Sequence, residues 1–127
     1  MTIRNTKNHS LTELQQAILD YLWSAGSGTA EQVREALLPK HPLKDSSVRT
    51  LLRRLEAHGY LTHRLEGKIF VYEAAMGPRR VAARAVAQII RRFCSGSGEQ
   101  FLLGMVDEKV LSKDEIRRLA RKIRSRK

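Results

Sequence analysis

Three arginines and two hydroxyl side chains share one face of a predicted helix. Placed at 100° per residue, the face opposite the apolar stripe holds Ser46, Thr50 and Arg53, flanked by Arg49 and Arg54. None of the five is a carboxylate. Arginine can donate two parallel hydrogen bonds to guanine, and a serine or threonine hydroxyl can contact a base or a phosphate. These residues predict a helix that enters a DNA groove, and the alternative is an ordinary solvated face.

Further basic residues lie just before this helix and in a hairpin predicted after it. Lys44 directly precedes the helix, while Arg64 and Lys68 fall near the hairpin turn. We expect contacts to backbone phosphates from all three, since an ammonium or guanidinium group suits a phosphate oxygen. The alternative for the two hairpin residues is that they are solubilising charges on an edge strand.

No enzyme site or metal site is predicted. The sequence has no glycine-rich phosphate loop, no nucleophile elbow and no paired carboxylates, so we expect neither catalysis nor a cofactor. His58 and His63 flank one turn, but no third ligand follows at a useful spacing. Cys94 lies near two arginines, and a half-buried interface cysteine is the more common outcome than a reactive thiol.

Two capping boxes introduce the first two predicted helices. Thr12 with Gln15, and Thr29 with Gln32, each place a hydroxyl and an amide where they satisfy the free N–H groups of a helix start. The glycines within 26–28 end the first helix.

The third helix, which carries the polar face, begins near Asp45 or Ser46, either of which can cap it. Gly59 is well placed for the left-handed residue that follows a helix. The apolar stripe has helical spacing and consists of Val48, Leu51, Leu52 and Leu55.

The apolar period then changes from helical to two. Residues 61–66 and 68–73 read as two strands joined at Gly67, which predicts a β-hairpin. Three helices followed by a hairpin form the winged helix-turn-helix arrangement, here over 1–76. The expected fold class is mainly α with a small β-hairpin (α+β).

Residues 77–127 predict a helical arm. Pro78 opens a long amphipathic helix, 95–98 break it, 101–106 are apolar, and a capping box at Ser112 opens a last helix. The apolar faces would be exposed in a monomer, so we expect a twofold dimer, with folding back onto the winged domain as the alternative. The expected dimerisation residues are Val86, Ile89, Ile90, Phe93, Phe101, Leu102, Val106, Ile116, Leu119 and Ile123.

The 127-residue chain carries 24 Lys and Arg against 13 Asp and Glu, a net charge of +11. Such a basic chain usually meets a polyanion, most often nucleic acid. Residues 76–127 hold most of the excess, which also suits a non-specific architectural DNA-binding protein. The single cysteine, the polar first ten residues and the absence of a membrane-length apolar run favour a cytoplasmic protein with no membrane association.

The stretch from Leu11 through Tyr72 resembles the penicillinase-repressor (BlaI/MecI/CopY-type) family of winged-helix transcriptional regulators. The matching segments are 11–14 with 22–23, 29–33, 47–55 and 59–61, and the wing at 67–72. The layout after residue 77 is also similar.

This resemblance implies a homodimeric, sequence-specific repressor of palindromic operators. It places Ser46, Ser47, Arg49, Thr50 and Arg53 in the recognition helix. Some members are induced by a protease that cuts an Asn-Phe bond, but the matching stretch here is Leu-Gly-Met-Val at 103–106. Copper-responsive members carry a cysteine cluster, which this chain lacks. The inducing signal, and any sensor or protease, stays open.

Overall fold

The computed structural model describes residues 11–126, and it divides them into two compact units. The first ends at Ala85 and the second begins at Val86. The polar first ten residues, His9 among them, lie outside the described residues. No helix in the described part of the chain is both long and apolar enough to span a bilayer.

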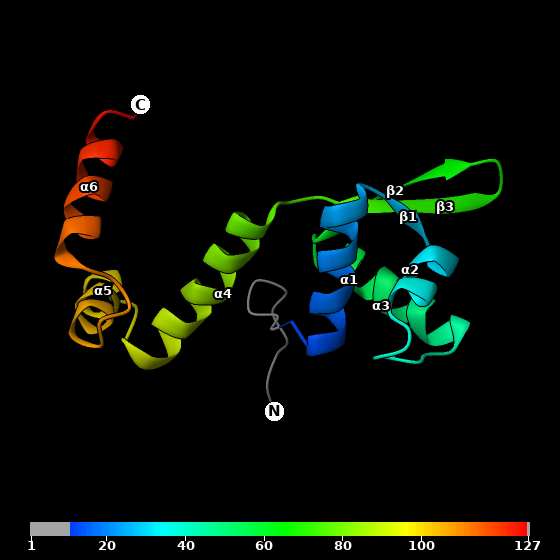
Figure 1. The fold of residues 1–127 in the computed structure, drawn as a ribbon, viewed down its shortest axis with the longest axis horizontal. Helices are drawn as coiled ribbons and strands as arrows, with labels where there is room; N and C mark the ends of the chain where they lie inside the picture. The colour runs from blue at the N-terminus through cyan, green and yellow to red at the C-terminus, as the bar shows by residue number, and fades with distance from the viewer. Residues whose placement is uncertain (1–10, 127) are drawn as a thin grey trace. The chain divides into compact units, whose positions relative to one another are not determined.

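The first unit has the predicted winged-helix order, with one additional short strand. Figure 1 shows the β2–β3 hairpin extending away from the three helices that precede it. The α+β fold class is therefore confirmed. The elements are α1 (Glu13–Ala25), β1 (Gly28–Thr29), α2 (Ala30–Ala36), α3 (Asp45–Ala57), β2 (Leu61–Glu66), β3 (Ile69–Ala74) and the start of α4 (Pro78–Phe93).

The core of this unit lies where α1, α2 and α3 pack together under the sheet. The predicted stripe of α3 supplies three of its fully buried side chains, while Leu51 is only partly buried. Trp23 closes one edge, since its indole N–H donates to the carbonyl of Met76 at 3.0 Å and so joins α1 to the end of the hairpin. The largest fully buried side chains are Ile18, Leu19, Leu22, Val33, Val48, Leu52, Leu55 and Leu61.

The helix starts confirm two predictions and correct one. Thr12 with Gln15, and Thr29 with Gln32, form reciprocal capping boxes. Helix α3 differs, because its N-cap is Lys44, which makes no side-chain capping hydrogen bond. Asp45 is the first residue inside the helix, and its carboxylate binds Arg49 in the next turn instead of a backbone N–H.

Helix α3 ends as predicted, with Gly59 in the left-handed region at φ 88°. The N–H of Tyr60 donates to the carbonyl of Leu55 at 2.9 Å, and that of Gly59 donates to Glu56 at 3.0 Å. This pair of bonds is a Schellman motif, which requires a residue that accepts positive φ. Gly59 therefore sets the angle at which the chain leaves α3 and enters the hairpin.

Replacing Gly59 by alanine is expected to destabilise the protein by about 1–2 kcal/mol, the cost of a β-carbon in the left-handed conformation. Gly77→Ala is the matched control, since Gly77 has no positive φ and no atom lies within 4 Å of its added carbon. Urea unfolding of both variants checks this. Equal midpoints for the two variants would contradict it.

The sheet is antiparallel, with strand order β1-β3-β2. Strand β3 pairs with β2 from Leu61↔Ala74 to Glu66↔Ile69, and with β1 at Gly28↔Tyr72 and Thr29↔Val71. The sequence predicted the hairpin but not β1, where 26–28 were taken only as the end of α1. Strand β3 thus lies between β2 and β1, and its pairing with β1 holds the hairpin next to the start of α2.

The second unit contains the end of α4, then α5 (Gly98–Asp107) and α6 (Lys113–Arg124). The apolar piece at 101–106 is thus part of a helix. Ser112 and Glu115 form the predicted capping box of α6. No described residue of this unit is fully buried, so much of its apolar surface would contribute to stability only if a further surface covered it.

Candidate nucleic-acid interface

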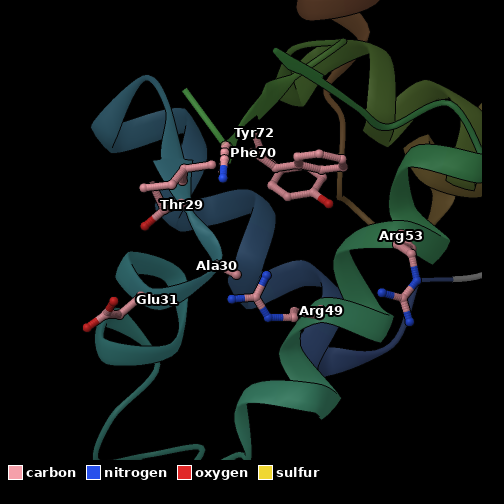
Figure 2. Close-up of a pocket in the computed structure, with 9 residues that line it drawn as sticks. Thr29, Ala30, Glu31, Arg49, Arg53, Phe70 and Tyr72 are labelled. Carbon is pink, nitrogen blue, oxygen red and sulfur yellow. The ribbon is translucent and has the colours of Figure 1, made fainter. Parts of the chain in front are cut away.

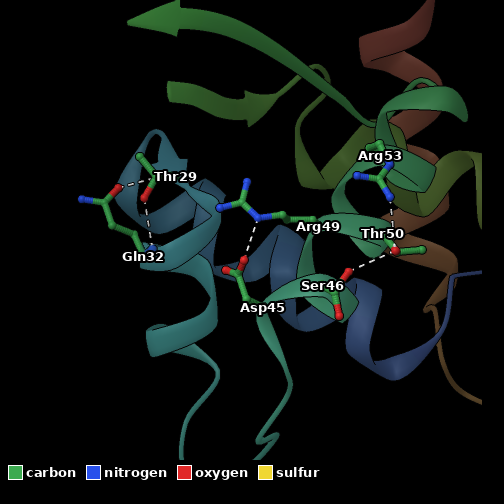
Figure 3. A network of polar contacts seen from close by, with 7 residues as sticks. All are labelled: Thr29, Gln32, Asp45, Ser46, Arg49, Thr50 and Arg53. Atoms are coloured by element: carbon green, nitrogen blue, oxygen red, sulfur yellow. Dashed lines mark hydrogen bonds and ion pairs between the residues drawn. The ribbon is translucent and has the colours of Figure 1, made fainter. Parts of the chain in front are cut away.

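The polar face of α3 is held by hydrogen bonds between successive turns (Figure 3). The Thr50 hydroxyl donates to the carbonyl of Ser46 at 3.0 Å, and it accepts from Nη2 of Arg53 at 3.3 Å. Arg53 is exposed and Thr50 is half-buried. The one hydroxyl donor of Thr50 is used within the helix, whereas Arg53 keeps further guanidinium N–H donors that are able to hydrogen-bond to a groove or a phosphate.

Arg49 forms an ion pair with Asp45, a residue that the sequence predicted only as a possible helix cap. Its Nε donates to Oδ2 of Asp45 at 2.7 Å, with both side chains about half exposed. This hydrogen bond, together with the negative charge of Asp45, raises the pKa of Arg49 above its ordinary value. Asp45 leaves the remaining guanidinium donors of Arg49 available, and it limits the orientations that the side chain adopts.

The polar face of α3 also borders a hollow of about 400 Å³. Ser46, Ser47, Thr50 and Arg54 line it from α3. Leu14, Leu43 and Leu51 supply the apolar part of the wall. Lys44 is exposed at the start of the helix. The residues expected on the recognition face therefore lie on the exposed side of a helix whose other side is core.

A second hollow of about 360 Å³ lies between α3 and the wing (Figure 2). It brings Lys68 of the hairpin turn to the same space as Arg49 and Arg53, which the sequence analysis did not foresee. Two aromatic side chains of β3 form its wall. The lining residues are Thr29, Ala30, Glu31, Arg49, Arg53, Lys68, Ile69, Phe70 and Tyr72.

The two hairpin cations lie in different settings. Arg64 pairs with Val71 across the sheet, on the face opposite Tyr72. Its guanidinium lies 2.9 Å from Glu66 and 3.5 Å from Glu73. Arg64 thus does not line the hollow, and a phosphate contact from it stays a prediction that requires exchange of these partners.

His63 joins the wing to the end of α3. Its Nδ1 lies 2.8 Å from both carboxylate oxygens of Glu56. Its ring stacks on Phe70, with centroids 4.2 Å apart. Residues 11–126 contain no group of three or more His, Cys, Asp or Glu side chains arranged to hold a metal ion. His63 instead fixes the wing against the helix.

The expected dimerisation residues all lie in the second unit, and all remain at least partly exposed. Phe93 is the extreme case, with 74% of its surface exposed, and Ile123 is 54% exposed. Leu102, Leu119 and Ile89 are also exposed, while Val86, Ile90, Phe101, Val106 and Ile116 are half-buried. A monomer leaves these apolar faces in water.

Comparisons with known proteins match nearly the whole chain. A family model described as Penicillinase repressor matches residues 11–125. An uncharacterised 16.5 kDa protein of Latilactobacillus sakei is 26% identical over 111 residues, covering 87% of this chain and 76% of that protein. The methicillin resistance regulatory protein MecI of Mammaliicoccus sciuri is 22% identical over 115 residues, covering 91% and 94%.

A solved structure supports the fold of the first unit. The solution structure of the DNA-binding domain of the repressor BlaI has a TM-score of 0.50 and 21% identity. The match covers 60% of this chain and 90% of that domain. At this identity the likeness concerns the fold, and it agrees with the winged-helix order of elements described above.

Proposed function

This chain belongs to the penicillinase-repressor family, and from that membership we propose that it is a transcriptional repressor that binds operator DNA as a homodimer. In this proposal α3 is the recognition helix and the hairpin is the wing. Bound at an operator, the dimer excludes polymerase.

The observation that carries the proposal is the shared setting of three cations. One hollow is lined by Arg49 and Arg53 of α3 and by Lys68 of the wing. The turn at Gly59 connects α3 to the wing and brings the wing cation to the same side as the two arginines. In a winged helix, the recognition helix enters the major groove, and this arrangement lets wing cations contact the adjacent phosphates. Guanidinium donors supply base recognition, and the ammonium supplies sequence-independent attraction.

The homodimer is proposed from the unburied apolar side chains of the second unit. A twofold interface would remove them from water and would present two recognition helices to a symmetric site. This explains why α4, α5 and α6 carry large apolar residues that no described part of the chain buries. Residues 1–76 would then bind DNA and residues 77–127 would mediate dimerisation.

Selection of bound fragments from the source genome, at near-physiological salt, tests the proposal. We expect a twofold-symmetric motif whose half-sites lie about one helical turn, roughly 34–36 Å, apart. Binding affinities are then measured for duplexes that carry individual selected sites and for scrambled duplexes of the same composition.

Recovered fragments with no common motif would contradict the proposal. That result would favour a non-specific architectural DNA-binding protein, which the cations of α6 would suit. Binding would then show steep salt dependence and little preference between duplexes. Salt titrations on a selected and a scrambled duplex distinguish the two functions.

A further inference from the structure

Tyr72 is a buried residue whose hydroxyl faces the hollow between α3 and the wing. The residue as a whole is only 5% exposed, but its hydroxyl oxygen is not among the buried polar atoms that lack a partner. The hydroxyl makes no hydrogen bond with any residue that the structure describes, so it opens onto the hollow. Figure 2 shows the phenol oxygen directed toward α3, on the side where Arg49 and Arg53 lie. The hydroxyl is therefore available to donate to a group that enters the hollow.

The phenol is a proton donor at neutral pH. Burial raises the pKa of Tyr72 most, and the negative charge of Glu56 raises it further, against the opposing effects of Arg53 and Arg49. The net shift is upward, so the hydroxyl keeps its proton. The two guanidiniums lie close enough to influence this ionisation, which places three donor groups around one space.

We propose that this hollow binds one phosphate group, with the Tyr72 hydroxyl as the central donor and Arg53, Arg49 and Lys68 as the surrounding cations. A phosphate oxygen accepts from a phenol and a guanidinium at the same time. Phe70 and Ile69 shield the site on the wing side. Within the proposed function, on which this assignment rests, the group is a backbone phosphate of the operator. A free phosphate ester has the same chemistry.

Three carboxylates lie near the site: Glu31, Asp45 and Glu56. Glu56, whose charge acts on Tyr72, is hydrogen-bonded to Nδ1 of His63. Glu31 lines the hollow, but its side chain points away from the aromatic rings and from Arg49 (Figure 2). Asp45 is bound to Arg49. Arg53 and Lys68 have no ion pair among the described residues. Among the residues that line the hollow, three cations stand against one carboxylate, so the lining carries a positive excess.

Tyr72→Phe removes only the hydroxyl and keeps the ring. We expect it to weaken binding of the selected duplex about tenfold, the scale of one hydrogen bond to a charged group. The affinity for a scrambled duplex should fall by the same factor, because a contact to a phosphate does not depend on the base sequence. Tyr21→Phe, a substitution in α1 outside the hollow, is the matched control and should leave both affinities unchanged.

Neutral methylphosphonate linkages, placed one at a time along a half-site, identify the phosphate. At one linkage, the combined loss of affinity from the neutral linkage and from Tyr72→Phe should be smaller than the product of the two separate fold-losses. Both changes would there remove the same contact. Multiplicative losses at every linkage, or an unchanged affinity of Tyr72→Phe for duplexes that the wild type binds, would overturn the proposal.

Inorganic phosphate tests the site without DNA. In the wild type, millimolar phosphate should shift the Nε–Hε resonances of Arg49 and Arg53 in a nitrogen-edited NMR spectrum, and the shifts should be weaker in Tyr72→Phe. If the wild type binds no duplex but shows these shifts, the proposed function fails while the phosphate site stands, with a free ester as its ligand. Absence of both responses would refute the site.

Discussion

Replacing both Arg49 and Arg53 by alanine should lower affinity for the selected duplex by at least about 100-fold, because each bidentate arginine contact to a base contributes roughly 1–3 kcal/mol. The discrimination between selected and scrambled duplexes should fall as well. Both arginines are exposed on α3, so the loss should come from binding and not from folding. Fluorescence anisotropy with both duplexes measures the effect.

The matched control removes the same charge elsewhere. Arg79→Ala with Arg80→Ala changes two exposed residues at the start of α4, outside both hollows of the first unit. This control should lower affinity only through the smaller net charge, and equally for both duplexes. If it matches the α3 variant in both affinity and discrimination, net charge explains the binding and the recognition role of α3 is wrong.

The sequence predicted those features of the fold that depend on residues close together along the chain. The boxes at Thr12, Thr29 and Ser112 are correct because a capping hydroxyl and its partner are only three residues apart. The α3 stripe is correct since helical spacing alone decides which side chains face the core. The prediction of a left-handed residue at Gly59 is correct because few other residues accept that backbone angle.

Competition between side chains limited the prediction at the start of α3. Asp45 is a good capping residue, yet its carboxylate pairs with Arg49 one turn later. Capping preference does not reveal which of two nearby partners a carboxylate selects. The same pair restrains a residue that the sequence analysis treated as a free cation.

Pairing across long stretches of chain explains the other omissions. Strand β1 has only two residues, too few to show an alternating pattern, and its partner Tyr72 follows more than forty residues later. The hollow depends on that pairing, because β1 helps hold β3 opposite α3. The sequence analysis included Tyr72 in the predicted wing. The alternation of side chains along β3 would have placed Tyr72 and Phe70 on one face of the strand, the face that lies toward α3.

Replacing Leu119 and Ile123 of α6 by alanine is expected to convert the proposed homodimer to monomers at micromolar concentration. Their exposed fractions are 45% and 54%, and a twofold interface would contain four truncated side chains. With about 1–2 kcal/mol lost at each, the dissociation constant should rise by at least about 1,000-fold. Sedimentation velocity across a concentration series measures this change.

The same variant separates dimerisation from DNA contact. A monomer with an intact winged helix should bind a single half-site as the wild-type monomer does, but it should lose the gain that the second half-site provides through effective concentration, about 100-fold or more. Arg118→Ala with Lys122→Ala alters charged residues of the same helix and should remain dimeric. A Leu119, Ile123 variant that sediments as the wild type does would place the interface elsewhere in the second unit. If it sediments as a monomer yet binds the full operator with wild-type affinity, the link between dimer and operator symmetry fails.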